Sequence, residues 1–67
     1  MSRYYRYTLH GETSIWEISV DGKKERLLKS GENEFLKLMT LNTWVQRVKG
    51  NGTETFITQE QAFLELL

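Results

Sequence analysis

The chain has 67 residues and carries nine basic and nine acidic side chains, so its formal net charge is zero with His10 neutral. This length allows one domain, and we expect residues 1–67 to form a single small α+β domain. Because the chain has no cysteine, disulfide frameworks and thiolate metal sites are excluded. The balanced charge gives no electrostatic argument for binding nucleic acid.

The sequence predicts a cytoplasmic location. No apolar run approaches the roughly 18 residues that a membrane-spanning helix needs. The first residues, from Met1 to Tyr5, contain no apolar segment of the kind found in secretory signals. We therefore expect a protein that neither crosses nor contacts a membrane.

The first half of the chain has the composition of β-strands. Residues 3–9 are rich in aromatic side chains, and residues 13–20 are rich in β-branched and aromatic ones. Both compositions favour strands. Residues 10–12, which include a glycine, are predicted to form the turn between them.

Asp21 and Gly22 form the strongest short hairpin signal in the chain. Residues 24–29 are therefore predicted to form a third strand, which makes the first half an antiparallel meander. The register set by a two-residue turn brings an acidic side chain opposite a basic one, and two apolar side chains together. These pairs are Glu17 with Arg26 and Trp16 with Leu27.

The spacing of apolar residues changes in the second half to the period of a helix. Residues 30–34 combine a capping residue with carboxylates, which is typical of a helix start. On a helical wheel of residues 38–49, most apolar side chains fall within an arc of about 120°. The pattern predicts a helix of roughly 17 residues that Gly50 ends. The apolar residues on the arc are Leu38, Leu41, Trp44, Val45 and Val48.

A rival interpretation of the same segment remains open. Thr43, Val45 and Val48 are poor helix formers, and they would suit a strand. In this alternative, residues 43–48 and 53–57 form a hairpin across the glycine-rich turn between them.

The end of the chain contains a short strand and a second helix. Residues 53–57 have strand composition. Thr58 and Gln61 have the spacing of a capping box, and Ile57 can pack on Ala62 as a hydrophobic staple. The expected fold is thus α+β, with a three-stranded antiparallel meander, a helix, a short strand and a C-terminal helix, the helices packed on one sheet face.

No residue pattern indicates catalysis, a cofactor or a metal. His10 is the only histidine, and its neighbours Glu12 and Ser14 are too close in sequence to form a triad with it by any recognised pattern. The acidic residues have no metal-ligand spacing, and the glycines match no phosphate-binding loop. We expect a protein that is not an enzyme.

Strand alternation predicts a binding surface. Alternate residues of a strand point to opposite faces, so Tyr5 lies on one side of the sheet and Tyr4 on the other. If the helices cover the Tyr5 side, the other side stays open with tyrosine, arginine and aliphatic side chains, a composition typical of protein contacts. The predicted binding residues are Tyr4, Arg6, Ile15, Glu17, Lys24 and Arg26.

The function that this surface favours is that of a protein–protein interaction module, a small regulator or inhibitor that acts by occupying a surface. The alternative is a nucleic-acid-binding protein that uses the basic and aromatic N-terminal strand. An ordinary solvated sheet face with Tyr–Arg packing would have the same composition. A homodimer through the helix at residues 38–49 or through an edge strand is a further hypothesis.

Overall fold

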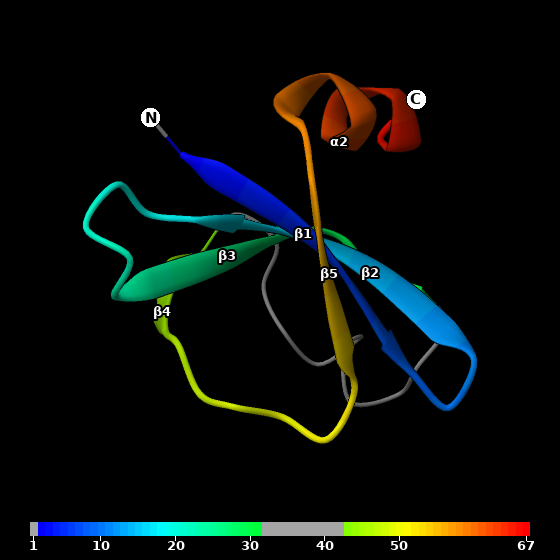
Figure 1. Ribbon diagram of the computed structural model, residues 1–67, viewed down its shortest axis with the longest axis horizontal. Helices are drawn as coiled ribbons and strands as arrows, with labels where there is room; N and C mark the ends of the chain where they lie inside the picture. The colour runs from blue at the N-terminus through cyan, green and yellow to red at the C-terminus, as the bar shows by residue number, and fades with distance from the viewer. Residues whose placement is uncertain (1, 32–42) are drawn as a thin grey trace.

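The computed structural model describes residues 2–31 and 43–67. Within these ranges, five strands form one antiparallel sheet and a single helix follows the last strand (Figure 1). The strand order is β4-β3-β2-β1-β5, so β4 and β5 are the two edges of the sheet. The elements are β1 (Arg3–Leu9), β2 (Glu12–Ile18), β3 (Lys24–Lys29), β4 (Val45–Gln46), β5 (Thr53–Ile57) and α2 (Gln59–Glu65).

The turn between β1 and β2 has only two residues. Leu9 is paired with Glu12, and the intervening His10 and Gly11 both have positive φ values, of 52° and 77°. Two positive φ values define the turn whose twist matches that of the flanking strands. His10 is therefore an exposed turn residue.

The hairpin between β2 and β3 has the predicted register, but its turn is longer than the expected two residues. β2 ends at Ile18, β3 begins at Lys24, and the Gly22 amide donates a 2.9 Å hydrogen bond to the Ser19 carbonyl. Glu17 faces Arg26 and Trp16 faces Leu27. The Asp21 carboxylate stabilises the turn by accepting hydrogen bonds from the Ser19 hydroxyl (2.6 Å) and the Lys23 amide (3.0 Å), as Asx side chains do in turns. The pairing shifts by one residue at Ile15, which lies opposite Lys29.

The sheet is larger than the expected three-stranded one. β5 extends it by pairing with β1, with Thr55 opposite Arg6, and β4 extends it by pairing with β3, with Val45 opposite Glu25. The described residues agree with the α+β class, as a small antiparallel sheet with one C-terminal helix. Pairings between strands that lie far apart in the chain leave no local sequence signal, so the sequence predicts only the pairings within the meander.

The helix expected over residues 38–49 is wrong for residues 43–49. Within this range the only regular element is β4, whose Val45 packs against the apolar cluster of the sheet. The tertiary contact prevails over an apolar spacing that happened to fit a helix, in a segment with low helix propensity. The rival hairpin is wrong as well, because β4 and β5 lie at opposite edges of the sheet. The earlier part of the predicted 17-residue helix falls within residues 32–42, which lie outside the described residues.

Apolar residues pack on both sides of the sheet, since neighbouring residues of a strand point to opposite faces. We call the two sides the Tyr5 face and the Tyr4 face. The Tyr5 face carries one buried cluster, and the Tyr4 face carries a second cluster together with Ala62 of α2. The first cluster consists of Tyr5, Trp16, Ile18 and Leu27, and the second of Tyr4, Ile15 and Ala62.

The predicted start of the C-terminal helix is confirmed. The Thr58 hydroxyl accepts a hydrogen bond from the Gln61 amide (3.1 Å), and the Gln61 side chain accepts one from the Thr58 amide (3.0 Å). These reciprocal bonds satisfy two amides that the first turn of a helix leaves unpaired. Ile57 packs on the cluster that contains Ala62, as expected for a hydrophobic staple.

Candidate functional site

The binding surface predicted from the sequence is largely inside the molecule. Of its six residues, three have at most 7 % of their surface exposed, two are half-buried and one is exposed. Side chains that are buried within the monomer cannot form an open docking surface. The buried residues are Tyr4, Ile15 and Glu17, the half-buried ones are Arg6 and Arg26, and the exposed one is Lys24.

The expectation that the helices leave the Tyr4 face open is wrong, because α2 lies on this face. Ala62 is the buried residue of α2, and its small side chain lets the helix approach Tyr4 and Ile15 closely. The Phe63 ring meets the Tyr4 ring edge to face, with centroids 5.8 Å apart, a favoured aromatic geometry. The alternation of the strands says which residues share a side, but not which side the helix covers.

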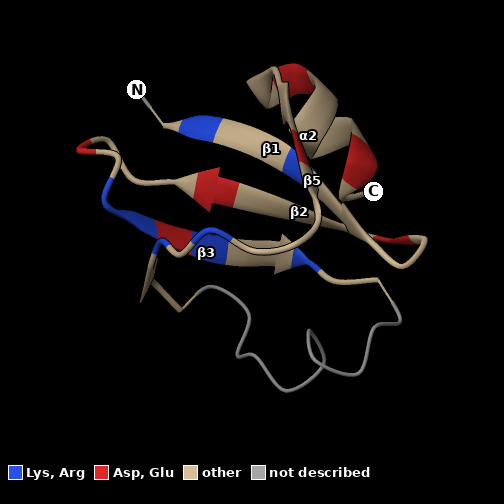
Figure 2. Cartoon of the chain, turned by 60° about the horizontal axis from the view of Figure 1, so that its bottom comes forward, with Lys and Arg blue, Asp and Glu red and all other residues tan. Residues whose placement is uncertain are grey.

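Basic groups of the sheet hold the end of α2 in place. The Arg6 guanidinium forms an ion pair of 2.6 Å with the Glu65 carboxylate, and the Lys29 ammonium donates a 2.7 Å hydrogen bond to the Glu65 backbone carbonyl. Cations at the last carbonyls of a helix are favourable. On the sheet itself, the Arg26 guanidinium forms an ion pair of 2.6 Å with the Glu17 carboxylate. Figure 2 shows blue, basic bands on β1 and β3 and red, acidic bands on β2 and α2.

A polar cluster lies on the Tyr5 face. The Tyr5 hydroxyl donates a hydrogen bond of 2.6 Å to the buried Glu25 carboxylate. Arg47 approaches both Glu25 (3.7 Å) and Glu54 (3.1 Å), and its guanidinium lies over the Tyr5 ring at 5.2 Å. One cation thus serves two carboxylates and an aromatic face, which offsets the cost of burying Glu25.

Burial dominates the ionisation of this cluster. Removal from water raises the pKa of the Glu25 carboxyl, although the hydrogen bond from Tyr5 and the charge of Arg47 act in the opposite direction. Burial also raises the pKa of the Tyr5 phenol, and the hydrogen bond to Glu25 adds to this shift. A phenol held in its neutral form keeps its proton available for the bond to the carboxylate.

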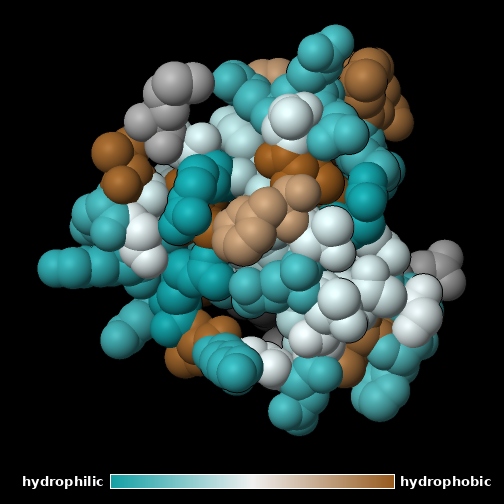
Figure 3. All heavy atoms as spheres, in the orientation of Figure 1, coloured by the Kyte–Doolittle hydropathy of each residue, from teal (hydrophilic) through white to brown (hydrophobic). Residues whose placement is uncertain are grey.

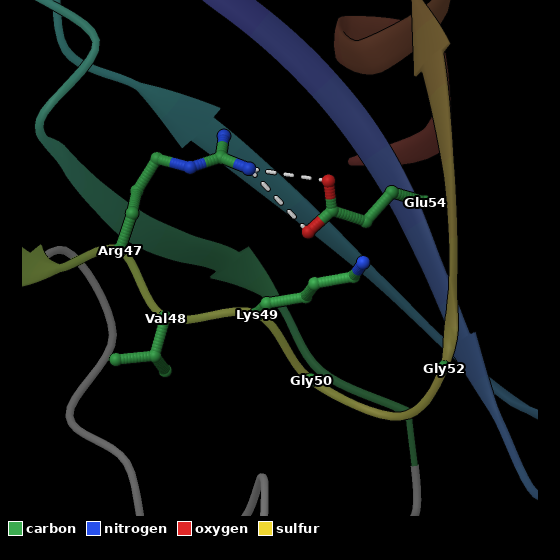
Figure 4. A pocket seen from close by; sticks show the side chains of 6 residues that line it. All are labelled: Arg47, Val48, Lys49, Gly50, Gly52 and Glu54. Carbon is green, nitrogen blue, oxygen red and sulfur yellow. Dashed lines mark hydrogen bonds and ion pairs between the residues drawn. The ribbon is translucent and has the colours of Figure 1, made fainter.

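A hollow lies beside this cluster, between β5 and the segment that precedes it. Arg47 and Lys49 reach from that segment toward Glu54, and both Arg47–Glu54 contacts are drawn in Figure 4. The Tyr7 hydroxyl accepts a hydrogen bond from the Gly52 amide at 2.9 Å. The hollow is lined by Arg47, Val48, Lys49, Gly50, Gly52 and Glu54.

The glycines of this segment fit closely over the Tyr7 ring. A β-carbon added to Gly50 would lie 2.5 Å from the Tyr7 hydroxyl, and one added to Gly52 would lie 2.5 Å from the Thr8 carbonyl oxygen. Both distances are well below van der Waals contact, so the positions require glycine. The segment is thereby pressed onto β1, and Arg47 is brought within reach of Glu25 and Glu54.

The chemistry available at the hollow is that of a compensated ion cluster. Arg47 is shared between two carboxylates, and a guanidinium cannot act as a general acid or base in proteins. Among residues 2–31 and 43–67, no group of three or more His, Asp or Glu side chains is placed to hold a metal ion. The cluster accounts for the attachment of the segment at residues 47–52 to the sheet.

The surface most unlike an ordinary solvated surface is the outer side of α2. Ala62 faces the sheet, while Phe63, Leu64 and Leu67 are 48 %, 62 % and 95 % exposed. These three apolar residues line a shallow depression together with Gln59 and Glu60. We call these five residues the α2 outer surface.

The remaining exposed apolar side chains of the described residues are spread over the molecule. In Figure 3 the brown, hydrophobic groups on the visible face stand apart from one another among hydrophilic side chains. Val20 lies in the turn after β2, Val48 follows β4, and Phe56 belongs to the edge strand β5. Single exposed apolar residues are common on proteins, whereas clustered ones mark interaction sites.

Comparisons with known proteins give no relative for this chain. No family model, no curated protein and no solved structure matches it. Among the described residues, no helix has both the length and the apolar character needed to cross a membrane.

Sequence reasoning overlooked Glu25, Arg47 and the α2 outer surface. A signal for Glu25 existed, because alternation from Leu27 places it on the Tyr5 face, and an acid there needs a partner. Arg47 had no comparable signal, since its role depends on a pairing between β3 and β4. For α2, the pattern QAFLELL places apolar residues on more than one side of the helix, which a helix with one buried side does not require.

Proposed function

We propose that this chain is a non-enzymatic protein-binding module that docks its partner on the α2 outer surface. The observation that carries the proposal is that the large apolar residues of α2 face away from the sheet. The helix buries one alanine against the sheet and exposes Phe63 and Leu64, and Leu67, just after the end of the helix, is exposed as well. In a chain of 67 residues, large apolar side chains left in water contribute nothing to folding, and a cluster of them is typical of an interaction site.

The attachment of α2 does not depend on these exposed residues, apart from the ring contact of Phe63 with Tyr4. A helix of seven residues is unstable alone, and this one is fixed by its capping box, Ala62, and the contacts of Glu65 with Arg6 and Lys29. Leu64 and Leu67 are free to contribute to binding. Apolar anchor residues of this kind are found at the centres of protein interfaces.

The rim of the surface indicates the chemistry of the partner. Glu60 is the charged residue that lines the depression, and its other polar neighbour is Gln59. Complementarity then favours a partner element with apolar side chains flanked by lysine or arginine. Binding of such an element would occupy the surface without any reaction, which suits a small regulator or inhibitor.

A protein partner is favoured over nucleic acid by the state of the arginines on the Tyr4 face. Arg6 is paired with Glu65 and Arg26 with Glu17, so neither guanidinium group is available to a phosphate without breaking an ion pair. If nucleic acid were the ligand, labelled oligonucleotides would bind at roughly 50 mM salt, with an affinity that falls steeply as salt is added. We expect no such binding.

The docking surface is tested by affinity capture from an extract of the source organism, followed by mass spectrometry. Three immobilised proteins are compared: the wild type, Leu64→Asp, and the control Val20→Asp, which changes an exposed apolar residue away from α2. We expect one protein to be retained by the wild type and the control and lost with Leu64→Asp. Equal retention by Leu64→Asp would show that the partner docks elsewhere.

A further inference from the structure

The sheet has one long free edge. β5 pairs with β1 on one side, and no described strand pairs with its other side. Antiparallel strands direct half of their amides and carbonyls to each neighbour, so the outer side of β5 presents a row of unpaired backbone groups. Thr53, Thr55 and Phe56 on this strand are exposed.

This edge lacks the features by which proteins prevent strand addition. Such features are Pro, Lys, a bulge or a very short strand. β5 contains neither Pro nor Lys, and its pairing with β1 runs through all five residues without a register shift. Its one charged residue, Glu54, is neutralised by Arg47 at 3.1 Å. The opposite edge, β4, has only two residues, so it offers little to a partner.

The C-terminal helix leaves the edge accessible. α2 begins directly after β5, and its last residue, Glu65, contacts Arg6 of β1 and Lys29 of β3. The helix thus crosses the Tyr4 face from β5 toward β3, away from the outer side of β5. A second strand can approach this side without meeting α2 of the same chain.

The sequence of β5 is complementary to itself in one register. When two copies are related by a two-fold axis perpendicular to the sheet, every side chain stays on the same face of the combined sheet. Facing residues must then be an even number of positions apart in the sequence, so one residue at the axis faces the same residue of the second copy. With the axis at Thr55, all five residues of each strand are paired. An axis at Glu54 or at Phe56 pairs only three, and the first of these also brings two carboxylates together, which is unfavourable.

We infer that two copies of this chain associate through β5, antiparallel and with Thr55 facing Thr55, so that one sheet continues through both copies. In this register Thr53 faces Ile57 of the second copy, and Glu54 faces Phe56 of the second copy. The Phe56 ring, 55 % exposed in the single chain, then covers the methylene groups of the second copy's Glu54. Backbone hydrogen bonds supply the affinity, as in other cases of strand addition. The dimer leaves the α2 outer surface free, so it is independent of the proposed docking function.

The register makes a test by charge exchange possible. Thr55→Lys and Thr55→Glu each place two like charges against one another at the axis, whereas an equimolar mixture of the two variants places opposite charges there. Light scattering should give a mass of twice 7.9 kDa for the wild type. We expect each variant alone to raise the dissociation constant at least about tenfold and the mixture to restore the dimer.

Thr53→Lys is the matched control, because it changes an equally exposed threonine of the same strand that faces Ile57 and not itself. We expect it to weaken the dimer less than Thr55→Lys, and mixing it with Thr53→Glu should restore nothing. If the Thr55 variants do not fold, hydrogen exchange of the wild type replaces them. The amides of β5 should then exchange more slowly as the protein concentration rises.

Three results would overturn the inference. The first is a wild-type mass of 7.9 kDa at concentrations up to about 1 mM, where even weak association is visible. The second is a dimer whose dissociation constant is unchanged by Thr55→Lys. The third is a dimer that Leu64→Asp dissociates and the Thr55 variants do not, which would place the contact on α2. The first two results leave the proposed docking function untouched, whereas the third would make the α2 outer surface the contact between two copies of the chain.

Discussion

The hydroxyl group of Tyr5 in β1 donates a 2.6 Å hydrogen bond to the carboxylate of Glu25 in β3, across the intervening strand β2. Both residues are almost completely buried. Arg47 lies close to the two groups, at 3.7 Å from Glu25 and 5.2 Å from the centre of the Tyr5 ring. The bond therefore joins three strands and the segment after β4 into one unit, and it can be tested directly.

Tyr5→Phe should lower the free energy of unfolding by about 1–3 kcal/mol. The substitution keeps the ring that stacks on Trp16 but removes the donor to Glu25, and a buried carboxylate that loses a partner is costly. Urea denaturation measures the change. In the background of Glu25→Gln, whose side chain carries no charge, the same substitution should cost less. Equal costs in both backgrounds would mean that the bond contributes nothing specific.

Substitution of two different carboxylates should change the stability relative to the wild type in opposite directions as pH rises. Because burial raises the pKa of Glu25 above its ordinary value of 4.5, its stabilising contribution is present below 4.5 and lost as pH rises through the raised pKa. Glu25→Gln should therefore gain stability relative to the wild type as pH rises from 4 toward 7.

Asp21 serves as a control whose pH dependence is opposite to that of Glu25. Hydrogen bonds from Ser19 and from the Lys23 amide lower the pKa of Asp21 below its ordinary value of 3.8, so its contribution is present above 3.8 and disappears as pH falls. Asp21→Asn should thus be least harmful in acid. Urea titrations at several pH values measure both slopes. Parallel slopes for the two variants would contradict the assignment of burial as the main influence on Glu25.

Ala62 and Leu64 should respond in opposite ways to substitution. Ala62 is fully buried between α2 and the sheet, so Ala62→Leu should overpack this contact and cost about 1–3 kcal/mol. Leu64→Ala removes a side chain that is 62 % exposed and should change stability by less than about 0.5 kcal/mol. Thermal unfolding compares them. A large loss with Leu64→Ala would show that Leu64 stabilises the monomer instead of serving a partner.

The contact between Gly50 and Tyr7 should appear as a coupling between two substitutions. A β-carbon on Gly50 would lie 2.5 Å from the Tyr7 hydroxyl but 3.3 Å from the ring carbon behind it. Gly50→Ala should therefore cost about 1–3 kcal/mol in the wild type and clearly less in the Tyr7→Phe background. Denaturation of the four proteins closes the cycle. Additive costs would mean that the loop does not press on Tyr7 through its hydroxyl.

Local features of the sequence predicted local features of the structure. The capping box at Thr58 and Gln61 and the turn at Asp21 and Gly22 depend on residues within a few positions of each other. The cross-strand pair of Glu17 and Arg26 was predicted from a two-residue turn, and the longer turn of the structure keeps the same register. These predictions needed no knowledge of the remainder of the chain.

The partners of the outer strands and the side that α2 covers were decided by the tertiary structure alone. β5 pairs with β1 and β4 with β3, and no residue near these strands specifies its distant partner. Alternation correctly separated Tyr4 from Tyr5, but both faces of the sheet were apolar enough to accept a helix. Contacts between distant residues made the choice, through the fit of Ala62 against Tyr4 and Ile15 and the ion pair of Arg6 with Glu65.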